Sequence, residues 1–124
     1  MSEANKEQDP RRILAYFFIL ADGHCNSGAR IAATILLSLY NGHRFQLDLT
    51  DLRMLDERHL NMALALMRFD ARISQEVHEH LNAMYDRTDF GPRFEHLAHR
   101  WGMKGKCAKR QLSKVPPLTL ADPF

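Results

Sequence analysis

The sequence predicts an all-α fold, with five or six short helices in an orthogonal bundle and a basic, extended C-terminal tail. Five segments carry apolar residues at the three- and four-residue spacing of an amphipathic helix, and no segment shows a convincing strand pattern. Residues 100–114 contain six basic side chains and no acidic one, which predicts the tail. We therefore expect a flexible N-terminus over residues 1–9, a helical domain over 10–102 and a basic, Pro-containing tail over 103–124.

The first predicted helix begins after Asp9, which can cap it, with Pro10 at the first helical position, and it ends near Ala21. Its residues are apolar on nearly all sides, so we expect it to be the central helix of the bundle. Part of its surface then needs a cover beyond the other helices. Two covers are open: a second copy of the chain in a homodimer, or the apolar residues of the terminal segment, which are Leu118, Leu120 and Phe124.

The second predicted helix runs from about Gly28 to Tyr40, and Asn26 or Ser27 can cap it. An Asn-Gly pair directly after it is a strong stop signal. We expect residues 43–49 to be irregular or briefly extended, because three apolar residues alternate there.

Two helices of unequal length are predicted in the middle of the chain. Asp48 or Thr50 can open a short helix over residues 51–55. Asp56 can cap a longer helix over residues 57–69. We place the apolar stripe of the longer helix at Leu60, Ala63, Leu64 and Met67.

The last two predicted helices show clear helical spacing. Ser74 can cap the first of them, and the pair Gly91-Pro92 can open the second, which ends at Gly102. The spacing identifies core positions throughout the bundle, among them Phe17, Ile35, Leu64, Leu81, Leu97 and Trp101.

Length and composition predict one cytoplasmic domain. A chain of 124 residues is long enough to bury a core without metal or disulfide staples. The first 12 residues are polar, which argues against a signal peptide, and the longest apolar run, over residues 13–21, is too short to cross a membrane. Cys25 and Cys107 are expected to be free thiols in a reducing compartment.

The first candidate site is the polar loop GHCNSGAR, which opens the second helix. A Gly/Ser-rich turn at a helix start presents free backbone N–H groups, so Ser27, Gly28 and Arg30 are candidates for binding an anion or a partner. The loop lacks the Lys-Ser/Thr pair of a phosphate-binding P-loop. A plain helix connection, with glycine supplying positive φ and Asn or Ser a cap, remains the alternative.

Two patterns suggest chemistry without meeting its requirements. Cys25 lies beside His24 near a helix start, where a thiol pKa can fall, but neighbours in sequence do not make a catalytic dyad. The seven histidines lack any zinc motif, so we predict no catalytic residue, no metal and no cofactor. They are His24, His43, His59, His78, His80, His96 and His99.

The second candidate site is the basic tail. Residues 1–99 carry 11 basic and 14 acidic side chains, whereas residues 100–124 carry 6 and 1. A basic segment on a slightly acidic body can bind nucleic acid or an acidic protein surface, and it can also be simply solvated. Its candidate residues are Lys104, Lys106, Lys109, Arg110 and Lys114.

Residues 22–70 contain GHCNSGARIAATILLSLYNG followed by FQLDLTDLRMLD. This stretch resembles a family of small uncharacterised helical proteins met on plasmids, integrative elements and prophages of proteobacteria. The resemblance implies a mobile-element setting, in which small helical proteins bind DNA or bind and block a host protein complex. It implies no activity and no functional residue.

These observations favour a non-enzymatic binding protein, a phage-related or mobile-element accessory or inhibitor protein that binds a host macromolecular complex. A DNA-binding protein that uses the basic tail is the first alternative, and a small thiol-dependent enzyme built on Cys25 is the second. We expect no membrane partner, and a homodimer stays open.

Overall fold

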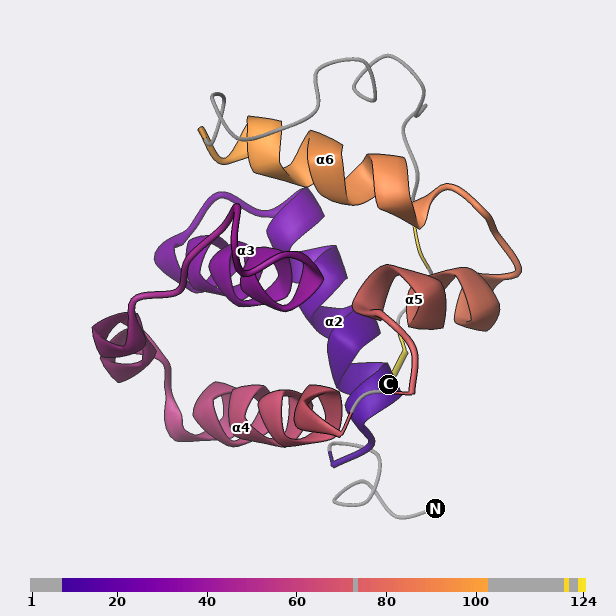
Figure 1. Cartoon of the computed structure of the whole chain (residues 1–124). Helices are drawn as coiled ribbons and strands as arrows, with labels where there is room; N and C mark the ends of the chain where they lie inside the picture. Colours follow the sequence, from indigo (N-terminus) through magenta and orange to yellow (C-terminus); the bar gives the residue numbers. More distant parts are fainter. Residues whose placement is uncertain (1–7, 73, 103–119, 121–122) are drawn as a thin grey trace.

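The computed structural model describes residues 8–72, 74–102, 120 and 123–124 (Figure 1). All regular structure in these ranges is helical, which confirms the predicted all-α fold. The elements in chain order are α2 (Pro10–Gly23), α3 (Ser27–Tyr40), the 3₁₀ helix η1 (Leu49–Met54), α4 (Glu57–Ala71), α5 (Val77–Tyr85) and α6 (Phe90–Arg100).

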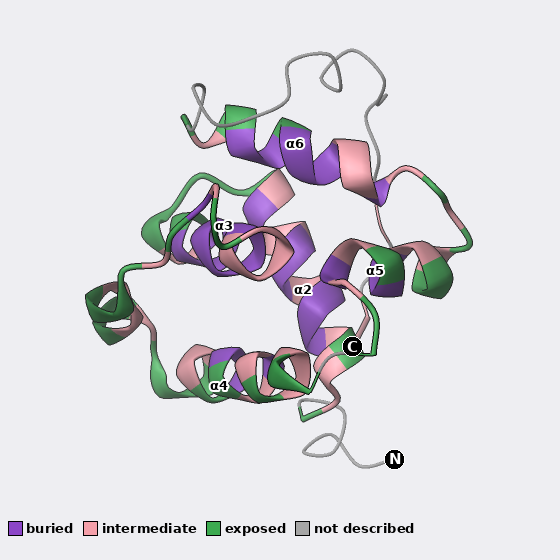
Figure 2. Cartoon of the chain, viewed as in Figure 1, coloured by how far each residue is buried: buried purple, intermediate pink, exposed green. Residues whose placement is uncertain are grey.

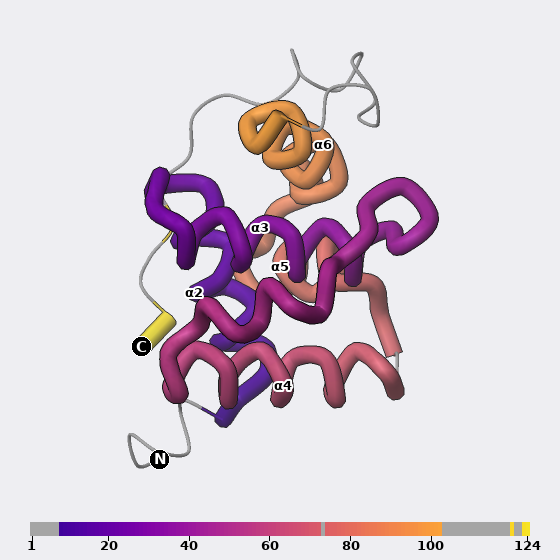
Figure 3. Tube along the Cα trace, turned by 90° about the vertical axis from the view of Figure 1, so that its left-hand side faces the viewer, coloured from indigo at the N-terminus to yellow at the C-terminus, as the bar shows by residue number. Residues whose placement is uncertain are grey.

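The helix α2 is the centre of the bundle, as its apolar sequence predicts. It packs most extensively against α3 and also contacts α4 and α5, while α6 packs on α3 and α5. Figure 1 shows α6 and α4 at opposite ends of this arrangement, and Figure 3 shows the same separation from the side. In Figure 2, burial is concentrated on α2, α3 and α6, whereas η1 is largely exposed. None of the described helices is both long enough and apolar enough to cross a bilayer.

Four predicted caps close the helix starts, because a short polar side chain accepts a backbone N–H that the helix leaves without a partner. Asp9 accepts from Arg11 N at 3.1 Å, and Asn26 accepts from Ala29 N at 2.8 Å. Two further caps open η1 and α4, namely Asp48 on Thr50 N at 2.9 Å and Asp56 on His59 N at 2.8 Å.

Some expected boundaries and conformations were wrong. Ser74 does not cap α5; Glu76 does, in a reciprocal capping box with Glu79, whose carboxylate accepts from Glu76 N at 2.9 Å. The box satisfies two backbone donors, so it outcompetes a single hydroxyl. The predicted helix over 51–55 is a 3₁₀ helix that begins two residues earlier, and α6 begins one residue before Gly91. Residues 43–48 are irregular, which is one of the two conformations expected there.

The core contains most of the predicted positions. Phe17, Ile35, Leu81 and Leu97 are all buried. Leu64 was placed in the core wrongly, since 48% of it is exposed. Of the predicted α4 stripe Ala63 is buried, together with Met62 and Leu66, while Leu60 and Met67 are half-buried. Trp101 is partly buried at the end of α6, where its indole Nε1 donates to Ala21 O at 2.8 Å.

The end of the chain covers part of α2. Leu120 and Phe124 pack against the core, and the Phe124 ring meets the Tyr16 ring edge-on at 5.5 Å between centroids. Arg12 Nη1 also donates to Pro123 O at 3.2 Å. The terminal segment therefore supplies one of the two expected covers, although Leu118 lies outside the described residues.

A buried carboxylate joins the end of α3 to α6. Glu95, with 5% of its side chain exposed, accepts two hydrogen bonds from the Arg44 guanidinium at 2.6 and 2.7 Å. The Tyr40 hydroxyl donates to the same carboxylate at 2.7 Å. Burial, reinforced by the Glu95 hydrogen bond, raises the pKa of Tyr40 to about 12. This network anchors the chain that leaves α3.

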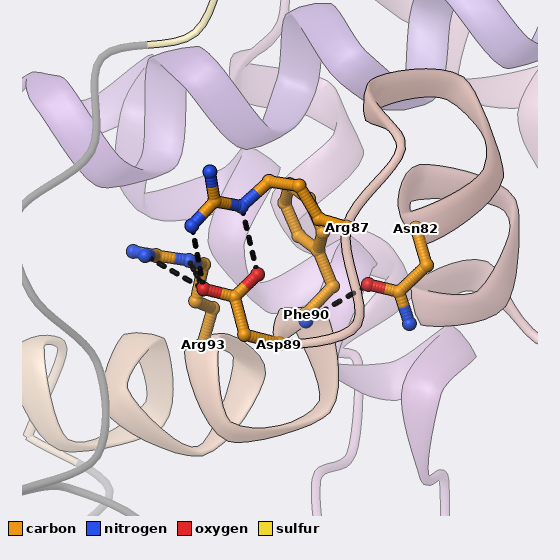
Figure 4. A network of polar contacts seen from close by, with 5 residues as sticks. All are labelled: Asn82, Arg87, Asp89, Phe90 and Arg93. Carbon is orange, nitrogen blue, oxygen red and sulfur yellow. Dashed lines mark hydrogen bonds and ion pairs between the residues drawn. The ribbon is translucent and has the colours of Figure 1, made fainter.

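A second network links α5 to the start of α6 (Figure 4). Asn82 in α5 accepts from Phe90 N at 3.0 Å, where α6 begins. Asp89 accepts from Arg87 Nε and Nη2, both at 2.9 Å, and from Arg93 Nε at 2.9 Å. The Arg87 hydrogen bonds hold the pKa of the Asp89 carboxyl well below its usual range, with Arg93 adding to the effect.

This lowered pKa predicts a pH dependence of stability. The Asp89 contribution is fully present above the unfolded pKa of about 4 and is lost as pH falls from there toward the lower folded pKa. We expect Asp89→Asn to destabilise the protein at neutral pH, and the difference from wild type to shrink as the solution is acidified. Urea unfolding of both proteins across this acidic pH range measures the difference between their free energies of unfolding. A difference that does not change with pH would contradict the lowered pKa of Asp89.

Candidate functional site

A cavity of about 320 Å³ lies where α2 faces the starts of α3 and α4 and the end of η1. Its wall is mainly apolar, with polar groups contributed by the two helix starts. The lining residues are Tyr16, Phe17, Leu20, Asn26, Ser27, Gly28, Ala29, Ala32, Ile35, Met54, Leu55, Asp56 and His59. A mostly apolar hollow with a few convergent polar groups is the usual form of a binding site in a small domain.

Three of the lining side chains form a hydrogen-bonded chain. Asp56 Oδ1 lies 2.7 Å from His59 Nδ1, and His59 Nε2 lies 2.8 Å from the Tyr16 hydroxyl. The hydrogen bonds that Asp56 accepts from the His59 backbone and ring lower the pKa of its carboxyl. The Tyr16 ring also stacks on the His59 ring, with 5.7 Å between the ring centroids. The Arg58 guanidinium lies over the Tyr16 ring, 5.5 Å from its centroid.

The Asp56 carboxylate determines which atom donates and which accepts in each of these hydrogen bonds. An ionised carboxylate only accepts, so His59 Nδ1 carries the proton that faces Asp56. In the neutral ring His59 Nε2 is then an acceptor, and the Tyr16 hydroxyl donates to it. The Tyr16 oxygen therefore keeps its lone pairs as the unused hydrogen-bonding capacity of the chain.

Only part of the predicted anion-binding loop lines this cavity. Ser27 and Gly28 line it at the start of α3, whereas Arg30 does not. Arg30 instead lies 3.7 Å from the Asp51 carboxylate and 3.8 Å from Met54 Sδ, both in η1. The loop glycines do not adopt a positive φ, since Gly102 is the one described glycine whose φ is positive.

The thiol candidate lies elsewhere. Cys25 is exposed, and its Sγ accepts from Arg100 Nη2 at 3.6 Å, while the same guanidinium nitrogen donates to His24 O at 3.0 Å. A smaller hollow of about 150 Å³ is lined by Cys25, Arg100 and Trp101. Arg100, the first of the basic residues, therefore ties the end of α6 to the loop before α3.

The histidines are dispersed. His96 and His99 are exposed on α6, while His80 is buried beside Phe69, and burial, with Arg11 adding to it, lowers the His80 pKa. The Nδ1 atom of His78 is buried without a hydrogen-bond partner. In the part of the chain that the structure describes, no three His, Cys, Asp or Glu side chains converge as metal ligands.

The candidates in the basic tail, Lys104, Lys106, Lys109, Arg110 and Lys114, lie outside the described residues, as does Cys107.

Tyr16, Asp56 and His59 are site residues that sequence reasoning missed. The Asp-x-x-His spacing at the start of α4 does carry a signal, because a capping residue and the third helical residue face each other. Nothing in the spacing brings Tyr16 to them, since it lies 43 positions away from His59.

Comparison with known proteins finds one family. The model of DUF7673, a family of unknown function, matches residues 13–102, which contain the whole cavity wall. No curated protein and no solved structure matches the chain.

Proposed function

Because the chain belongs to the DUF7673 family of unknown function, we propose its role from its own surface: a non-enzymatic binding protein that docks on a macromolecular partner through η1. The observation that carries the proposal is the exposure of two large apolar residues on one short helix. Leu49 is 70% exposed and Met54 is 56% exposed. Exposed apolar side chains that gather on one element are typical of an interaction surface.

The surroundings of η1 support a protein partner. No residue of η1 is fully buried, and of its apolar residues only Leu52 packs against the core, so Leu49 and Met54 are available for contact. The Arg30–Asp51 ion pair beside Met54 supplies polar groups at the edge of the apolar residues. An apolar centre with a charged rim is the usual composition of a protein interface.

The resemblance to small proteins of mobile elements narrows the class of partner that we propose. In that setting the partner is a protein complex of the bacterial host, and binding serves an accessory or inhibitory purpose. DNA binding through the basic segment is the alternative, and it predicts a different set of sensitive residues.

We expect the double variant Leu49→Asp, Met54→Asp to lose its partner, because two charges would be desolvated at the interface. Leu64→Asp is the matched control, since Leu64 is also apolar and 48% exposed but lies on α4. Wild type and both variants are used to capture partners from the native cell, and the captured protein is then purified and its affinity measured. A loss of at least about tenfold in the double variant alone supports the proposal.

The same experiment tests the alternative. A third variant neutralises the five tail cations Lys104, Lys106, Lys109, Arg110 and Lys114. If duplex DNA is the ligand, this variant loses it, and the logarithm of wild-type affinity falls with the logarithm of salt concentration with a slope of roughly −4 to −5. Capture that is unchanged in the η1 variant would contradict docking through η1.

A further inference from the structure

We propose that the cavity between α2, α3, η1 and α4 binds a small neutral aromatic molecule that carries one hydroxyl group. This inference is independent of the macromolecular partner. The cavity measures about 320 Å³, which lies at the lower end of the range of small-molecule pockets, roughly 300–1,000 Å³.

The apolar wall defines the body of the ligand. Phe17, Leu20 and Ile35 contribute hydrocarbon from α2 and α3, and Leu55 closes the side of η1. Release of water from such a wall provides the main part of the binding free energy. The rings of Tyr16 and Phe17, tilted by 45° with centroids 6.2 Å apart, offer faces and edges to a flat aromatic ligand.

The hydrogen-bonded chain defines the polar group. With a neutral His59 ring, the Nδ1 proton is donated to Asp56 and the Tyr16 hydroxyl proton to His59 Nε2, as the 2.7 and 2.8 Å contacts allow. The Tyr16 oxygen can still accept a hydrogen bond, so it selects a ligand that donates one. A ligand that only accepts, such as an ether, gains nothing from Tyr16.

Charge disfavours an anionic ligand beside Asp56, although the Asp56 side chain is 66% exposed and water screens its charge in part. Asp56 lines it, and hydrogen bonds from His59 hold the pKa of the Asp56 carboxyl below its usual range, so it is ionised near neutral pH. An anion among these residues would meet like charge, whereas a hydroxyl group is neutral and still donates. The ligand class is therefore a phenol or naphthol.

Three probes that share the naphthalene ring test the inference: 2-naphthol, naphthalene and 2-methoxynaphthalene. Each is titrated into the full isotope-labelled chain while backbone amide signals are followed by NMR. We expect shifts at Ala29, Ala32 and His59, and a 2-naphthol affinity about 3- to 10-fold above that of naphthalene, the ratio that one net hydrogen bond supplies. The methoxy compound should bind no more tightly than naphthalene.

Tyr16→Phe should abolish the preference for 2-naphthol over naphthalene, because it keeps the aromatic ring and removes only the oxygen that accepts the hydrogen bond. Tyr40→Phe is the matched control, because it removes a half-buried tyrosine hydroxyl that bonds Glu95 away from the cavity, and it should keep the preference for 2-naphthol. His59→Ala is a second variant, which frees the Tyr16 proton, so 2-methoxynaphthalene should then gain affinity. Equal wild-type affinity for 2-naphthol and naphthalene, shifts that map elsewhere, or no binding of either probe up to its solubility would each overturn the inference.

Discussion

Replacing Glu95 with Ala is expected to lower the free energy of unfolding by about 3 kcal/mol, the low end of the range for breaking a buried ion pair. The low end applies because the Arg44 side chain keeps 30% of its surface exposed, so water partly compensates the cation that is left behind. Tyr40 also loses the acceptor of its 2.7 Å hydrogen bond. For a chain of this size the loss corresponds to a fall in melting temperature of roughly 10 °C.

A double-mutant cycle assigns this loss to the pair itself. Glu95→Ala, Arg44→Ala and the double variant are unfolded in urea at neutral pH. The double variant should be clearly more stable than the sum of the single losses predicts, because neither the Arg44 guanidinium nor the Glu95 carboxylate is left without its charged partner. Strictly additive losses would show that Glu95 and Arg44 act independently, against their 2.6 Å contact.

Leu81→Ala is expected to destabilise the protein by about 2–5 kcal/mol, because the side chain is fully buried between α5 and the rest of the bundle and its removal leaves a cavity. Leu64→Ala is the matched control, since Leu64 lies in a helix, is 48% exposed and should change stability by no more than about 0.5 kcal/mol. Thermal or urea unfolding of the two variants compares them directly. Equal losses would place both leucines in the same environment and contradict the packing of α4.

The helix starts could be predicted from sequence because capping is local. Asp9, Asn26 and Asp56 each bond a backbone N–H within three residues, so the evidence is contained in a few neighbouring positions. The face of α4 could not be predicted in the same way. Residues 62–67 are all apolar, so several stripes fit the helical period, and only packing against α2 decides that Leu66 is buried and Leu64 is not.

The candidate site was even harder to predict from the sequence than the buried face of α4. Ser27 and Gly28 are recognisable from the turn chemistry that precedes α3, and both line the cavity. The chain from Asp56 through His59 to Tyr16 spans two helices that are distant in sequence. Its members look like an ordinary cap, a helical histidine and a core tyrosine until the fold brings them together.

The weak anchoring of η1 has a kinetic consequence. It packs mainly on α3, none of its residues is fully buried, and of its apolar residues only Leu52 packs against the core, so little apolar area is lost when it detaches. Segments of this kind open through local fluctuations at a small fraction of the global unfolding free energy. Amide hydrogens of Leu52 and Leu55 should therefore exchange with solvent far sooner than those of Ile35 in α3. Because Met54 and Leu55 also form part of the cavity wall, such openings give the interior a route to solvent while the bundle stays folded.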